Sequence, residues 1–148
     1  MTDKLLNDDI TNQVTEFFQQ LQEPVEVLYF GRKDDCDYCG DTLQLLEELV
    51  ETSDKLALSA YDLNDDAGLA EQYRVDKVPG IVIAGRDGDQ ILDYGIRYSG
   101  IPAGHEFSSL INTMVLVSMR DSGLDPQTRQ VLAGLKKPVH LQVFVTPT

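Results

Sequence analysis

The sequence contains no tryptophan, only two cysteines and two histidines, and few basic side chains. Twelve Lys and Arg residues stand against 25 Asp and Glu residues, which gives a formal net charge of −13. This balance argues against nucleic acid as a partner, because binding to phosphates requires a basic patch. Two cysteines are also too few for the disulfide framework of a small secreted domain, and they fit a redox or metal site instead.

Long apolar runs and leader-like segments are missing too. No apolar stretch reaches the roughly 20 residues that a membrane-spanning helix requires. The start, Met1-Thr2-Asp3-Lys4, lacks the basic-then-apolar order of a signal peptide. We therefore expect no membrane association and a cytoplasmic location. The 148 residues, 42% of them apolar, are enough for one domain with its own core, or one domain plus a fragment.

Both cysteines lie in one stretch, around which the rest of the chain is arranged. An apolar run, Val25–Phe30, predicts a strand with both faces covered. A polar loop then leads to Cys36 and Cys39, and Thr42–Glu51 has a helical pattern. Helix N-termini carry unpaired N–H groups and the positive end of the helix dipole, both of which favour a thiolate. The arrangement is therefore the one expected of a reactive dithiol.

Helical and strand patterns alternate along the chain. In chain order they predict a helix over 8–21, a strand over 25–30, a helix from about 36 to 51, a strand over 56–62, a helix over 67–73, strands over 81–84 and within 90–98, and helices after 104 and over 125–135. Alternation implies parallel pairing, and the close hairpin at 85–89 implies an antiparallel end. We therefore predict an α/β fold with a mixed central sheet flanked by helices.

An internal repeat begins near the C-terminus. Four residues of the first helix-to-strand passage recur 114 positions later; they are Leu21, Pro24, Val25 and Phe30, matched by Leu135, Pro138, Val139 and Phe144. This predicts a unit over 1–122 and the opening helix and strand of a truncated second unit over 123–148. An unpaired apolar strand at Val139–Val145 needs a partner. We expect it to dock on the first sheet or to exchange between chains as a dimer.

A dithiol at this spacing can exchange electrons with another disulfide. One thiolate attacks and forms a mixed disulfide, and the second thiol then displaces the product. Exposure and position favour Cys36 as the nucleophile and Cys39 as the resolving residue. Nearby charges leave the thiolate's stability open: Arg32 and Lys33 favour it, whereas Asp34, Asp35 and Asp37 oppose it.

Two other interpretations of the dithiol are weaker. A zinc site needs two further ligands, and the only histidines, His105 and His140, lie on separate elements, so no metal is expected. A pair of inert buried cysteines fits poorly with such polar flanks.

For two neighbouring features, the sequence does not decide between a functional and a structural role. Tyr38 either contacts a bound partner or packs over the loop. Pro79 precedes an apolar strand, where the Val78–Pro79 bond is either cis, for a local purpose, or trans at a strand start.

Several motifs resemble the two-unit protein disulfide oxidoreductases of archaea and some bacteria, also called glutaredoxin-like proteins, which have a thioredoxin fold. They are Cys36-Asp37-Tyr38-Cys39, Arg97-Tyr98, the Gly100–Phe107 run and the ending Val143–Thr148. The resemblance implies that Pro79 is cis and faces the dithiol, that the Val78 backbone pairs with a substrate peptide, and that the activity is exchange with protein disulfides. We expect no cofactor, and a thioredoxin-reductase-type flavoprotein is the candidate reductant.

The sequence also departs from this family. A second C-x-x-C is absent. Thioredoxin has a buried aspartate on the strand before its dithiol, whereas the only acid of the corresponding strand here is Glu26, far from the helix. The main hypothesis is a thiol–disulfide oxidoreductase that uses Cys36 and Cys39, with Tyr38, Val78 and Pro79 contacting substrate. The alternative is a weakly active structural or regulatory module of a larger two-unit oxidoreductase.

Overall fold

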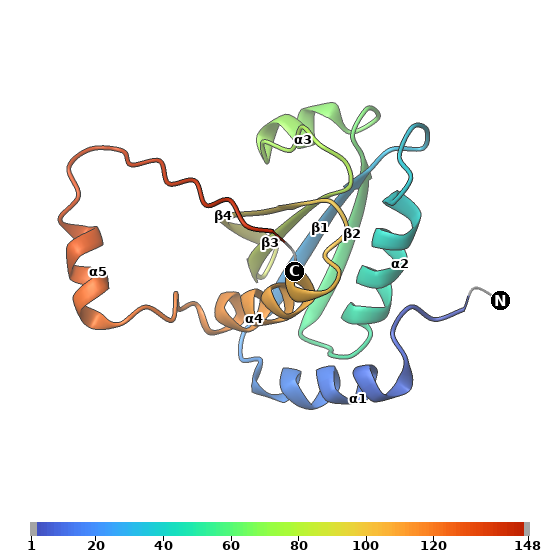
Figure 1. The fold of residues 1–148 in the computed structure, drawn as a ribbon, viewed down its shortest axis with the longest axis horizontal. Coiled ribbons are helices and arrows are strands. Elements are labelled where there is room, and N and C mark those ends of the chain that lie inside the picture. The colour runs from blue at the N-terminus through green and yellow to red at the C-terminus, as the bar shows by residue number, and fades with distance from the viewer. Residues whose placement is uncertain (1–2, 147–148) are drawn as a thin grey trace.

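The computed structural model describes residues 3–146, so the last two residues of the Val143–Thr148 motif lie outside the described part (Figure 1). The helices are α1 (Asp8–Phe17), followed by a 3-10 turn (Phe18–Gln20), α2 (Cys39–Val50), α3 (Ala67–Gln72), α4 (His105–Met119) and α5 (Pro126–Ala133). The strands are β1 (Val25–Gly31), β2 (Leu56–Asp62), β3 (Gly80–Asp87) and β4 (Gln90–Ser99). Among the described residues, no helix has both the length and the apolar character needed to cross a membrane.

The four strands form one mixed sheet in the order β2-β1-β3-β4. β1 is parallel to β2 and antiparallel to β3, and β3 and β4 form an antiparallel hairpin. The predicted combination of parallel pairing with an antiparallel end is confirmed. Phe30 pairs with both Tyr61 and Gly80, so the end of β1 meets the end of β2 and the start of β3 at one edge of the sheet.

Alternate residues of β1 divide the core between the two faces of the sheet. Val25, Val27 and Tyr29 pack on the face covered by α1, α2 and α4. Leu28 and Phe30 pack on the opposite face, together with residues of α3. All seven residues of β1 are buried, as the continuous apolar run predicted. Figure 1 shows α2 and α3 on different sides of β1, which is the central element of the domain.

Polar contacts fasten two segments of the unit. The guanidinium of Arg120 donates to three carbonyl oxygens, those of Val117, Pro24 and Arg86, and so ties the end of α4 to the entry of β1. The Glu48 carboxylate accepts hydrogen bonds from the backbone N–H groups of Leu5 and Leu6 and so holds the N-terminal segment on α2. Glu48 therefore has a structural role.

The C-terminal segment differs from the prediction. The predicted helix is present as α5, and it stands apart from the sheet without a buried residue (Figure 1). The predicted strand over Val139–Val145 is wrong for the described chain, because residues 139–146 form no strand and the sheet consists of β2, β1, β3 and β4. A strand exists only through hydrogen bonds to a neighbouring strand, and none of the four described strands pairs with this segment. Its apolar side chains are exposed, Phe144 by 89% and Leu141 by 85%.

Candidate redox site

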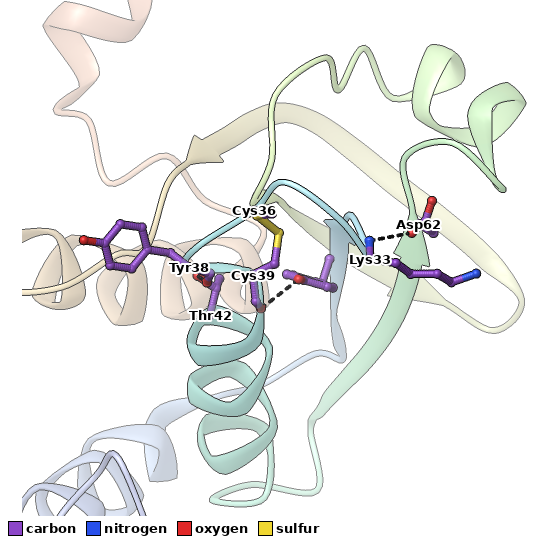
Figure 2. The surroundings of a disulfide bond; sticks show 7 residues. Lys33, Cys36, Tyr38, Cys39, Thr42 and Asp62 are labelled. Carbon is purple, nitrogen blue, oxygen red and sulfur yellow. Dashed lines mark hydrogen bonds between the residues drawn. A yellow bond between two sulfur atoms is a disulfide. The ribbon is translucent and has the colours of Figure 1, made fainter.

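The two cysteines are joined by a disulfide at the N-terminal end of α2 (Figure 2). Their Cα atoms are 5.5 Å apart. Cys36 lies in the loop between β1 and α2 and is half-buried, whereas Cys39 is the first residue of the helix and is only 6% exposed. The helix thus begins three residues later than the earliest predicted start, and Cys36 lies just before it. Solvent and large partners therefore reach the sulfur of Cys36 more readily than that of Cys39.

Hydrogen bonds from two neighbouring side chains fix the first turn of α2. The buried hydroxyl of Tyr29 on β1 donates to the backbone carbonyl of Cys39 at 2.8 Å. Thr42 donates through both its hydroxyl (2.6 Å) and its N–H (2.9 Å) to the carbonyl of Tyr38. Burial, with a smaller contribution from the negative charge of Asp62, raises the pKa of Tyr29, so this hydroxyl stays a donor at neutral pH.

Gly31 gives the Tyr29 ring the space that it needs. Both residues lie on the same face of β1, because they are two positions apart in a strand. A Cβ atom on Gly31 would lie 2.2 Å from the Tyr29 hydroxyl oxygen and 2.7 Å from Cζ. The side chain of Tyr29 therefore passes over Gly31 to reach the helix, and no larger residue fits at position 31 without moving it.

The loop before Cys36 is tied to the end of β2. The Asp62 carboxylate accepts hydrogen bonds from the N–H groups of Lys33, Asn64 and Asp65, and the Leu63 N–H donates to the carbonyl of Gly31 at 2.8 Å. The N–H donors of Asp65, Asn64 and Lys33 together lower the pKa of Asp62. The carboxylate thus stays ionised and holds the loop in place.

The Val78–Pro79 peptide bond is cis, as the family resemblance implies. Pro79 is buried directly before β3, and its carbonyl accepts a hydrogen bond from the N–H of Gly100 at 2.9 Å. Gly80 pairs with Phe30, which places the cis bond at the edge of the sheet where β1 leaves for the dithiol loop. Within residues 3–146, neither the N–H nor the carbonyl of the half-buried Val78 has a hydrogen-bond partner.

A cavity of about 410 Å³ opens beside the disulfide on the side of β2. Besides the two cysteines and two glycines, its lining includes Tyr29, Arg32, Lys33, Leu43, Ala60, Tyr61 and Asp62. A cavity of about 470 Å³ lies elsewhere, between β4 and the end of α4, where it is lined mainly by apolar atoms and contains no thiol. The chemistry of the dithiol therefore belongs to the smaller cavity.

The residues chosen from the sequence lie around this edge of the sheet, but they differ in exposure. Tyr38 is 58% exposed and projects away from the disulfide on the side opposite Lys33 (Figure 2). It therefore does not pack over the loop. Among residues 3–146, no three His, Cys, Asp or Glu side chains are grouped so that they could hold a metal ion.

Tyr29 and Asp62 both hold the site together, and neither is among the residues predicted from the sequence. A tyrosine two residues before a glycine at the end of a buried strand was an available signal for the first contact. Asp62 had no comparable signal, because its contact with the dithiol loop joins residues 29 positions apart.

No protein-family model matches the chain. The chain is 25% identical over 140 residues to the F component of the alkyl hydroperoxide reductase of Pseudomonas aeruginosa, a match that covers 95% of this chain and 24% of that protein. It thus spans about a quarter of the length of this curated relative.

Two solved structures share the fold. A protein disulfide oxidoreductase from Aeropyrum pernix superposes with a TM-score of 0.82 and 29% identity, over 99% of this chain and 62% of that one. The N-terminal domain of the alkyl hydroperoxide reductase AhpF from Enterococcus faecalis superposes with a TM-score of 0.77 and 23% identity, over 89% of this chain and 62% of that one. The predicted thioredoxin-like fold with a C-x-x-C disulfide, and the resemblance to disulfide oxidoreductases, are confirmed.

Proposed function

We propose that the protein is a thiol–disulfide oxidoreductase that exchanges protein disulfides through Cys36 and Cys39. The observation that carries this proposal is the disulfide itself, which lies at the start of a helix with one sulfur more accessible than the other. The similarity to the disulfide oxidoreductase from Aeropyrum pernix supports the same reaction. Keeping cellular thiols in redox balance and passing electrons between partner proteins are the roles that such a reaction serves.

The proposed reaction conserves electrons and protons. In the reduced protein, the Cys36 thiolate attacks one sulfur of a substrate disulfide, which breaks the substrate S–S bond and releases one substrate thiolate. The Cys39 thiol then gives its proton to the substrate thiolate already released, or to water, and attacks the Cys36 sulfur of the mixed disulfide. The second substrate thiolate leaves, and the Cys36–Cys39 disulfide forms. The protein loses two electrons, the substrate disulfide gains them, and the reverse sequence oxidises a substrate dithiol.

The substrate is proposed to bind where the cis bond and the dithiol meet the surface. Val78 offers a backbone N–H and carbonyl that no described residue occupies, which suits pairing with an extended peptide. Pro79 holds this segment beside the end of β1, and the exposed ring of Tyr38 supplies apolar contact on the other side. Protein disulfides presented in extended segments fit these contacts.

The chain is further proposed to work as part of a larger redox protein in the cytoplasm. The division into a unit over 1–122 and the start of a second unit over 123–148 is supported by the repeat at an offset of 114. The exposed apolar segment 139–145 also supports it, since this segment offers a surface for a partner strand. A thioredoxin-reductase-type flavoprotein would supply electrons, and two copies could pair through the C-terminal segment.

Reduction of insulin disulfides by dithiothreitol tests the activity. We expect the wild-type protein to accelerate it and Cys36→Ser to be inactive. Cys39→Ser is the matched variant, because it keeps the nucleophile and should accumulate a mixed disulfide visible by mass spectrometry. Wild-type rates equal to those of Cys36→Ser would reject the proposal in favour of a structural module.

Light scattering tests the pairing of chains. A dimer that becomes monomeric in Phe144→Asp supports the C-terminal interface, and a monomeric wild-type protein rejects it.

A further inference from the structure

The cavity beside the disulfide contains a cation, Arg32, that has no partner among residues 3–146. The Nε atom of Arg32 is buried and has no hydrogen-bond acceptor. Within residues 3–146, the Arg32 guanidinium takes part in no ion pair and no hydrogen bond. Buried donors are almost always paired in folded proteins, so an unpaired one at a site needs a physical explanation. Arg32 lines the same cavity as Cys36 and Cys39.

The other charged side chains around the cavity already have partners. Lys33, the adjacent cation, forms an ion pair with Asp65, and both side chains are largely exposed. Asp62 accepts its three backbone N–H donors, and the Tyr29 hydroxyl donates to Cys39. Tyr61, the remaining titratable residue of the lining, is uncharged at neutral pH in its ordinary state, and its ring packs against Phe30 with centroids 5.3 Å apart and planes tilted by 32°.

Negative charge next to the cysteines opposes a thiolate. Asp34, Asp35 and Asp37 are exposed in the same loop, and Asp41 lies in the first turn of α2. Their solvation weakens their effect on the dithiol. Of the two cations that line the cavity, Lys33 is paired, and Arg32, whose Nε is buried, has donors that no described residue uses.

We propose that Arg32 is a positioning residue that stabilises the Cys36 thiolate once the disulfide is reduced. This inference rests on the proposed function and adds to it the group that activates the nucleophile. In the oxidised protein both sulfurs are uncharged, so the guanidinium has no anion to bind. Reduction places a negative charge on Cys36, and the free donors of Arg32 can then pair with it. The contact therefore belongs to the reduced state and favours it.

This role has two measurable effects. A nearby cation lowers a cysteine pKa below the free value of about 8.5, and an opposite charge within about 4–6 Å typically shifts a pKa by about 1–3 units. Arg32→Met should therefore raise the Cys36 pKa by at least about one unit. At a pH above the Cys36 pKa of both the wild-type protein and the variant, the equilibrium constant for reduction of the disulfide by glutathione should be about tenfold lower in Arg32→Met. This moves the potential of the variant by about −30 mV. At a pH well below the Cys36 pKa of both proteins, Cys36 is a neutral thiol, and the potentials of the wild-type protein and Arg32→Met should be the same.

Lys33→Met is the matched control, because it removes the same charge from the next residue. Its effect on the Cys36 pKa should be small, since Lys33 is exposed and paired with Asp65. Arg32→Lys keeps the charge and should restore most of the shift. The Cys36 pKa is measured by thiolate absorbance in the reduced proteins, and the potential by glutathione equilibration at high and low pH.

The proposal predicts a pKa shift in Arg32→Met, rescue by Arg32→Lys and almost no shift in Lys33→Met. Equal shifts in the two methionine variants would overturn it, because they would reflect net charge alone. An unchanged pKa in Arg32→Met, with its disulfide formed and its unfolding transition intact, would overturn it as well. Both outcomes are separate from the proposed function, which stands or falls on insulin reduction by the wild-type protein.

Discussion

Replacing Gly31 by alanine should destabilise the protein, although a Gly-to-Ala change at an unstrained position usually stabilises by about 0.4–1 kcal/mol. The reason is steric. The new Cβ would lie 2.2 Å from the Tyr29 hydroxyl oxygen, which cannot move away freely because Tyr29 is only 5% exposed. Forcing a group into a packed core costs about 1–3 kcal/mol. Losing the hydrogen bond to Cys39 adds about 0.5–1.5 kcal/mol. We expect a net loss of about 0.5–4 kcal/mol in the free energy of unfolding.

A double-mutant cycle with Tyr29→Leu isolates this contact. Leucine lacks the hydroxyl and the ring atoms that approach Gly31, so Gly31→Ala should be neutral or stabilising in that background. The coupling free energy should be about 1–3 kcal/mol, as for residues in direct contact. Urea unfolding of the oxidised proteins, followed by circular dichroism because the chain has no tryptophan, gives these values. A loss below about 0.5 kcal/mol in Gly31→Ala, or equal losses in both backgrounds, would refute the reasoning.

Three further substitutions probe contacts around the domain. Arg120→Ala should lower the free energy of unfolding by about 2 kcal/mol, since the guanidinium serves three carbonyl oxygens; a loss no larger than in Arg120→Lys would contradict this. Thr42 is fully buried, and Thr42→Val removes its hydroxyl with little change in shape. Loss of the hydrogen bond to the Tyr38 carbonyl should lower the free energy of unfolding by about 1 kcal/mol, and an unchanged urea midpoint would count against this. Glu48→Gln should be destabilising at pH 7, with the difference fading in acid; a deficit that is the same at pH 3 and pH 7 would exclude the role of the charge.

The pH dependence of the Glu48 variant follows from its hydrogen bonds. Burial opposes ionisation, but the N–H donor of Leu6, the amide of Gln44 and the N–H of Leu5 outweigh it and lower the pKa of Glu48. A carboxylate with a depressed folded-state pKa contributes stability above its unfolded pKa of about 4.3. That contribution disappears as the pH falls through the folded-state pKa. Urea unfolding between pH 3 and pH 7 therefore measures it directly.

The sequence predicted the central domain well because its signals are local. Each signal lies within a few residues: the apolar run at 25–30, the alternating pattern at 56–62 and the close hairpin at 85–89. The structure contains the two strands and the hairpin that these signals predict. The position of the dithiol at a helix start follows from the same local pattern. The cis bond at Pro79 is confirmed too, although only the family resemblance favoured it over the trans alternative.

The features that the sequence did not predict depend on contacts between distant segments. The apolar pattern at 139–145 predicted a strand, but a strand requires a partner that no local pattern supplies. The charges near Cys36 likewise left its environment undecided. Only the folded chain separates Lys33, paired with Asp65, from Arg32, whose Nε is buried and unpaired. Long-range pairing therefore distinguishes two basic neighbours that look equivalent in the sequence.

The unequal burial of the two sulfurs has a consequence for regiochemistry. An incoming thiol that opens the disulfide meets the sulfur of Cys36 first, because Cys39 is buried in the core and Cys36 is only half-buried. Of the two possible mixed-disulfide isomers, one should therefore dominate. Brief treatment of the reduced protein with an alkylating reagent should likewise give a single adduct, on Cys36. The S–S bond is chemically symmetrical, but a partner can reach one of its sulfurs more easily than the other.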